Sequence, residues 1–180
     1  YSICEGAIKI DDLQDFSKSN KIRSLALCDT ANLCGALEFA EKISKVGTQP
    51  IIGTQINFKY DDCIALLPLF ALNEEGYKRI IKLSSTSYLE NDELSDPHID
   101  FNDLLDDNTG VAIFSGTIFG LFGELFNKGK FSEISELYKK LKLNFGDRFY
   151  IEVQRHNDHN ELSFEKFNLT KSLELEIPII

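Results

Sequence analysis

The stretch Ser24-Leu-Ala-Leu-Cys-Asp-Thr-Ala-Asn-Leu-Cys-Gly35 decides the fold class of this chain. Its apolar first half predicts a short buried strand from Ser24 to Cys28. Asn32 is a good N-cap residue, and apolar residues recur at helical spacing behind it as far as Ile43. Gly47 is the matching stop signal. A strand that leads into a helix in this way favours an α/β protein.

The rest of the chain repeats the alternation of strand and helix. Further strands are predicted at 51–58, 63–72, 110–114 and 149–153, and another strand begins at 178–180. Helices are predicted after Asn73 and at 101–105, 131–143 and 162–175. This alternation predicts βα units and a parallel sheet, either as part of a barrel or as an open, doubly wound sheet. The turn after Cys28 lacks the G-x-G-x-x-G pattern, which weakens the open, nucleotide-binding alternative.

Composition narrows the classes of function. The 180 residues suffice for one domain but fall short of the roughly 250 that a closed βα barrel usually needs. The net charge of -10 repels phosphate backbones, so this segment alone should not bind nucleic acid, and if the protein works on DNA, another region must hold the DNA. No apolar run is long enough for a membrane span. The four cysteines form no C-x-x-C pair and suggest reduced thiols in the cytoplasm.

Both ends suggest a piece of a longer protein. The chain begins at Tyr1 and contains no Met, and it stops where a strand begins. We therefore interpret residues 1–180 as a single domain that is cut at both ends.

Three polar residues lie in or directly after predicted strands. Asp29 follows the first strand, where barrel enzymes place functional groups, although a turn or cap role is the alternative. Gln55 lies within the second strand and is a poor ligand for a hard cation. Glu152 lies in an apolar strand, where a carboxylate needs a partner or a metal ion. Arg148 and Arg155 are the predicted partners.

Histidines and glycines give weaker signals. His156 and His159 have the i, i+3 spacing that two metal ligands can have, but the polar run around them favours a loop. His98, in the acidic stretch before 101–105, is expected to be exposed. The spaced glycines of 116–123 have apolar neighbours, which favours tight packing over a turn instead of a phosphate-binding loop.

Five segments of the chain follow one another in the order of a known family's motifs. They are Tyr1-Ser-Ile-Cys-Glu-Gly-Ala7, Ala26-Leu-Cys-Asp-Thr-Ala-Asn-Leu-Cys-Gly35, Pro50-Ile-Ile-Gly53, Ala71-Leu-Asn-Glu-Glu-Gly-Tyr77 and Phe149-Tyr-Ile-Glu-Val-Gln-Arg-His156. Together they resemble the PHP domain of bacterial DNA polymerase III alpha subunits. The resemblance implies a distorted, TIM-like βα barrel of seven strands, of which 1–180 lacks the first strand and the last elements. It also implies His and carboxylate ligands for several metal ions, which activate water for phosphodiester hydrolysis.

The chain departs from the ligand pattern that the resemblance implies. Thr30 stands where a His is expected after Asp29, Gln55 stands where an acid is expected, and Leu66 aligns with the next ligand His. Too few donors remain for multi-metal chemistry, so we expect no catalytic residue and no bound metal in this chain. The resemblance places the remnant metal pocket at Glu5, Asp29, Thr30, Gln55, Leu66 and Thr117, with Glu152 and His156 as possible supporting residues.

The resemblance also implies the expected function. The chain would be the N-terminal module of the catalytic alpha subunit, whose full length is a DNA-directed DNA polymerase with magnesium at a polymerase site elsewhere. The module would act as a scaffold and as a docking site for the proofreading exonuclease subunit, beside other replicase subunits. The alternatives are a metal-dependent PHP phosphoesterase or 3′–5′ exonuclease, and an α/β binding protein whose resemblance is accidental.

Overall fold

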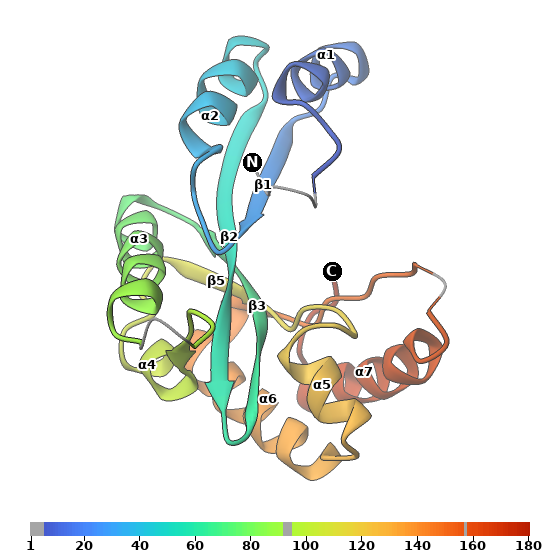
Figure 1. The fold of residues 1–180 in the computed structure, drawn as a ribbon. Coiled ribbons are helices and arrows are strands. Elements are labelled where there is room, and N and C mark those ends of the chain that lie inside the picture. The colour runs from blue at the N-terminus through green and yellow to red at the C-terminus, as the bar shows by residue number, and fades with distance from the viewer. Residues whose placement is uncertain (1–5, 92–94, 157) are drawn as a thin grey trace.

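The structure is a computed structural model that describes residues 6–91, 95–156 and 158–180. Figure 1 shows a mixed α/β arrangement built around the long strand β2. The strands are β1 (Ser24–Thr30), β2 (Gln49–Tyr60), β3 (Cys63–Ala71), β4 (Ile99–Asp100), β5 (Val111–Phe114) and β6 (Phe149–Tyr150). The helices are α1 (Ile10–Asn20), α2 (Ala36–Lys45), α3 (Glu74–Leu89), α4 (Phe101–Asp106), α5 (Leu121–Asn127), α6 (Phe131–Phe145), the 3₁₀ helix η1 (Gly146–Arg148) and α7 (Glu161–Leu175). The predicted α/β class is confirmed.

The six strands form one open sheet in the order β1-β2-β3-β5-β6, with β4 beside β2. The expected parallel sheet is only partly present, because β3 runs antiparallel to both β2 and β5. The cause is the two-residue turn Asp61–Asp62, in which Asp61 adopts a φ of 56° and Tyr60 pairs with Cys63. A turn this short joins antiparallel strands, whereas parallel strands need a crossover.

The predicted helix after Asn32 begins later than expected. The Asn32 side chain accepts a hydrogen bond from Cys34 N at 2.9 Å and donates one to Thr30 O at 2.8 Å. This closes a local turn, and α2 then starts at Ala36 with Gly35 as its N-cap. Asn73, by contrast, caps α3 as predicted, accepting from Gly76 N. Helices α1 and α5 and strand β4 were not predicted from the sequence.

Two apolar clusters hold the elements together. The larger one, the large core, packs one face of the β2–β3 hairpin against helices α3 to α7 and includes Phe122, Tyr138 and Phe149. The smaller one, the small core, joins α1 and α2 to β1 through Ile10, Phe39 and Ile43. Figure 1 shows α1, α2 and β1 gathered around the first half of β2, with the remaining helices around its second half.

The end of the described chain returns to the sheet. Pro178 O accepts from Ile151 N at 2.9 Å, and Ile180 O accepts from Val153 N at 3.0 Å. A parallel bridge joins Ile151 to Ile179, so the strand-like start predicted at 178–180 is confirmed. Among the described helices, none is long and apolar enough to cross a bilayer.

Candidate functional site

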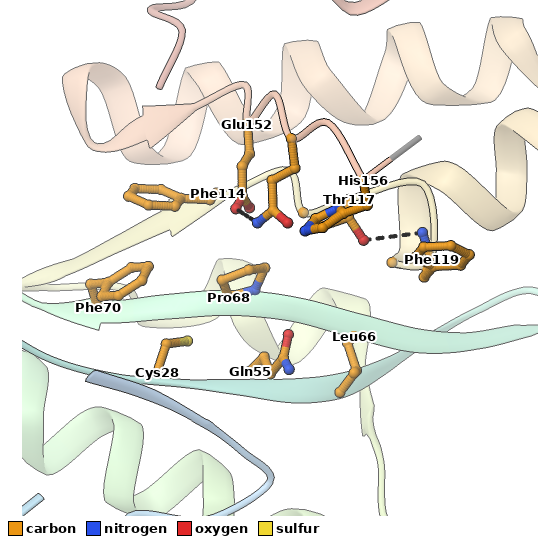
Figure 2. A pocket seen from close by; sticks show the side chains of 13 residues that line it. Cys28, Gln55, Leu66, Pro68, Phe70, Phe114, Thr117, Phe119, Glu152 and His156 are labelled. Atoms are coloured by element: carbon orange, nitrogen blue, oxygen red, sulfur yellow. Dashed lines mark hydrogen bonds between the residues drawn. The ribbon is translucent and has the colours of Figure 1, made fainter. Parts of the chain in front are cut away.

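A cavity of about 730 Å³ opens between the β2–β3 hairpin and the loops that follow β5 and β6. We call it the main cavity (Figure 2). Its volume falls in the range of ligand pockets, roughly 300–1,000 Å³. Its walls are mainly apolar, with a few polar groups. The lining residues are Cys28, Gln55, Leu66, Pro68, Phe70, Phe114, Gly116, Thr117, Phe119, Gly120, Glu152, Gln154 and His156.

The β1–β2 pairing brings two of the predicted positions together. Thr30 and Gln55 are paired across the two strands. The Gln55 carboxamide donates to Thr30 Oγ1 at 2.7 Å, so the two side chains satisfy each other. Asp29 is 4% exposed, and because side chains alternate along a strand it faces away from Cys28 and Thr30. Asp29 is not among the described residues that line the main cavity.

The third strand supplies an apolar wall. Leu66, Pro68 and Phe70 alternate along β3 and line the main cavity, while Ala65, Leu67 and Leu69 enter the large core. Both faces of β3 therefore carry apolar side chains of the strand itself. Phe70 and Phe114 stack with ring centroids 4.6 Å apart.

Glu152 lies after the short strand β6 and points into the main cavity beside Gln154 (Figure 2). Its backbone N–H donates to Ser115 Oγ at 2.9 Å, and the Gln154 carboxamide donates to its Oε1. Burial raises the pKa of Glu152, and hydrogen bonds from Gln154 and the Gly116 backbone only partly oppose this. A carboxyl with a raised pKa in a cavity is a typical sign of a functional site.

Neither predicted arginine pairs with Glu152. Arg148 donates to Asn108 O and Val111 O, both at 2.6 Å, and so anchors η1 to the start of β5. Arg155 forms a two-bond ion pair with Glu165 of α7, at 2.9 and 2.6 Å. The prediction was wrong because Arg155 points toward α7, away from the cavity wall.

The loop after Glu152 is held by a carboxylate of α7. Glu161 is 6% exposed and accepts from the backbone N–H groups of His156 and Asp158, at 2.7 and 3.1 Å. It also lies 3.2 Å from His156 Nδ1. Burial acts to raise the pKa of Glu161, but the bonds from His156 and Asp158 lower it overall. His156 is thus fixed at the cavity rim, whereas His159 is exposed and lies in the predicted loop.

Two further residues that line the main cavity, Cys28 and Thr117, offer no reactive group. Burial, with the nearby charges of Glu152 and Asp29, raises the pKa of the Cys28 thiol to about 12, so it stays protonated. Thr117 Oγ1 accepts from Phe119 N at 3.1 Å and shapes the turn after β5. That turn is tight, as predicted: a Cβ on Gly123 would lie 2.0 Å from the Ile118 carbonyl oxygen.

Comparison with known proteins decides the family. The sequence pattern described as "PHP domain" matches residues 1–156. The chain belongs to the PHP domain family. DNA polymerase III subunit alpha of Rickettsia felis is 36% identical over 181 residues, which cover 100% of this chain and 15% of that protein. The subunit of Caulobacter vibrioides is 33% identical over 189 residues, covering 100% and 16%.

The same match extends to a distant bacterium. DNA polymerase III subunit alpha of Borreliella burgdorferi is 34% identical over 190 residues, covering 99% of this chain and 16% of that protein. The chain is therefore a PHP domain homologous to that of replicative alpha subunits, and it spans about 15% of their length. A solved structure from Bifidobacterium adolescentis, named a candidate metal-dependent phosphoesterase, superimposes with a TM-score of 0.49 at 12% identity, covering 97% of this chain and 81% of that one.

Most of the metal-pocket and supporting positions predicted from the sequence lie around the main cavity. Gln55, Leu66, Thr117, Glu152 and His156 all line it, and Thr30 bonds to Gln55 in its wall. Glu5 lies outside the described residues.

Sequence reasoning missed the aromatic wall formed by Phe70, Phe114 and Phe119. The run Ile64–Ala71 is apolar without interruption, so it carries no alternation that could separate cavity-facing from core-facing residues. For Phe114 and Phe119, the loop geometry after β5 decides their direction.

Proposed function

We propose that this chain is the PHP module of a DNA polymerase III alpha subunit that has exchanged a metal centre for an interaction site. The full protein would extend DNA primers in the cytoplasm, using magnesium at a polymerase site outside this chain. The module would serve as a scaffold and as a docking site for the proofreading exonuclease subunit. Other replicase subunits and the DNA would contact other regions.

One observation carries the proposal. Thr30 and Gln55 stand where the resemblance implies an imidazole and a carboxylate, and they bond to each other at 2.7 Å. Hard cations favour anionic oxygen ligands, and a neutral amide and a neutral hydroxyl are weak substitutes for a carboxylate and an imidazole. Leu66, at a third implied position, offers no donor atom at all.

The remaining donors do not fit a multi-metal centre. Within residues 6–91, 95–156 and 158–180, no group of three or more His, Cys, Asp or Glu side chains is close enough to hold a metal ion. In the main cavity, Glu152 and His156 are the acidic and imidazole groups, and the Cys28 thiol stays protonated. We therefore assign no hydrolytic step to this cavity.

Charge and shape support docking over catalysis. The net charge of -10 disfavours direct contact with DNA. The main cavity has an apolar wall, and Phe119 at its rim is 63% exposed. An exposed aromatic beside an apolar hollow is typical of protein interaction sites.

Metal content of the full-length alpha subunit tests the loss of the metal centre. We expect no stoichiometric zinc or manganese in the wild-type module after dialysis against magnesium, measured by mass spectrometry of the metals. The triple variant Thr30→His, Gln55→Glu, Leu66→His restores the implied ligands and should gain bound metal. Two or more ions in the wild type, with 3′–5′ exonuclease or phosphoesterase activity, would establish the alternative function.

Binding of the exonuclease subunit tests the docking role separately. Phe119→Glu in the full-length protein should weaken binding of the purified exonuclease subunit, measured by surface plasmon resonance. Phe131→Glu, a 48% exposed aromatic on α6, is the matched control and should bind normally. Equal affinities of both variants and the wild type would move the docking site away from the main cavity.

A further inference from the structure

A second and much smaller cavity lies behind the wall of the main cavity. It measures about 10 Å³ and shares Thr117, Glu152 and Gln154 with the main cavity. Its other side is formed by α7, through Glu161, Phe164, Glu165 and Asn168. One ordered water needs roughly 10–15 Å³ of such space and at least two polar partners.

Two buried polar atoms in this cavity are complementary. Glu152 Oε2 is an acceptor and Asn168 Nδ2 is a donor, and both atoms are sealed from bulk solvent. Among the described residues, Asn168 Nδ2 has no hydrogen-bond partner, and Glu152 Oε2 has none within normal hydrogen-bond geometry, although the Gly116 backbone N–H lies close enough to act on the Glu152 carboxyl. Buried groups without partners are rare because leaving them unpaired is costly.

The surrounding bonds fix which atom of each side chain remains available. The Tyr138 hydroxyl donates to Asn168 Oδ1 at 2.9 Å, and both residues are almost fully buried. That bond leaves the Asn168 amide nitrogen as the free end. On the other side, Gln154 donates to Glu152 Oε1, which leaves Oε2.

We propose that the small cavity is a binding site for one ordered water molecule that accepts from Asn168 Nδ2 and donates to Glu152 Oε2. The water completes a buried set of hydrogen bonds that runs from Tyr138 through Asn168 to Glu152, whose backbone is held by Ser115. Through these hydrogen bonds the water links Glu152, in the wall of the main cavity, to Asn168 of α7. This inference does not depend on the function proposed for the main cavity.

A high-resolution crystal structure of the full-length protein tests the site directly. We expect density for a single water within hydrogen-bond distance of both Glu152 Oε2 and Asn168 Nδ2. An empty cavity, or a direct contact between the two side chains, would overturn the proposal.

Reversing the polarity of the pair gives a second test. Asn168→Asp keeps the acceptor for Tyr138 but removes the amide donor to the water and places a second buried carboxylate beside Glu152, where the two charges repel. We expect amide exchange of α7 peptides in the full-length protein to become several-fold faster, as measured by hydrogen–deuterium exchange. Adding Glu152→Gln restores one donor and one acceptor, so the double variant should return toward wild-type exchange and retain the water in its crystal structure.

One outcome of this exchange experiment would contradict the proposed water site. If the double variant exchanges as fast as Asn168→Asp alone, the two side chains are not linked and the proposal fails. Ser172→Ala is the control for general damage to α7. It removes a different buried bond of that helix, to Ile177 O at 2.6 Å, and Glu152→Gln should not rescue it.

Discussion

The two halves of strand β2 lie in very different surroundings. Its second half is enclosed by the large core, which draws on β3, β5, β6 and helices α3 to α7. Its first half meets the small core, where three buried residues hold α1 and α2 against β1 and β2. The main cavity lies where the halves meet, since Cys28 and Gln55 line it from one side and Glu152 from the other. Hydrophobic stabilisation scales with buried apolar area, so the large core should dominate the folding free energy.

The largest expected effect comes from breaking the large core. Phe122 is fully buried, with its ring 4.7 Å from that of Tyr138. Phe122→Ala should cost about 3–5 kcal/mol, which is a large share of the stability of an ordinary domain. Urea unfolding measures this cost. Phe119→Ala, a change of the same type at an exposed site in the same segment, should leave the midpoint nearly unchanged.

A change in the small core should act locally. Phe39 of α2 is fully buried, and Phe39→Ala should destabilise α1 and α2 by about 3 kcal/mol, the lower end for such changes, because fewer neighbours surround it. Hydrogen–deuterium exchange should accelerate in 10–45 but not in α6. Leu37→Ala on the exposed face of the same helix is the control. Equal acceleration in both halves would show that the chain unfolds as one unit.

Where the two halves of β2 meet, Glu152 should make the free energy of unfolding depend on pH. Its pKa is raised by burial, so the folded state binds the proton more tightly than the unfolded state. The stability contributed by this group is therefore complete below the ordinary carboxyl pKa and is lost as pH rises through the raised value. Glu152→Gln should raise the melting temperature at neutral pH, and the gain should disappear in acid. A gain that is independent of pH would contradict the charge-based explanation.

The smallest effect is expected at the surface of the β2–β3 hairpin. Lys130 bonds to Asp61 at 2.8 Å and to Asp62 at 3.2 Å, and hydrogen bonds from Lys130 and Lys128 lower the pKa of Asp62. The stability from Asp62 is thus present above the ordinary carboxyl pKa and is lost as pH falls through its lowered value. Lys130→Met should lower the urea midpoint slightly at neutral pH and not in strong acid. Added salt should shrink the difference, because these charges are exposed.

The sequence determined most of the elements and the α/β class, because local periodicity and capping residues such as Asn73 act over only a few positions, and its ordered motifs determined the family. Helices α1 and α5 and strand β4 were not predicted. The sequence also named five of the cavity residues, through the ligand and supporting positions that the family resemblance implies. It did not determine the direction of β3, which a two-residue turn at Asp61 sets. Nor did it determine that Gln55 donates to Thr30, that Asp29 faces away from the cavity, or that Glu152 bonds to Gln154 instead of an arginine. Those features depend on strand register and on contacts between residues distant in the chain, which only the tertiary structure brings together.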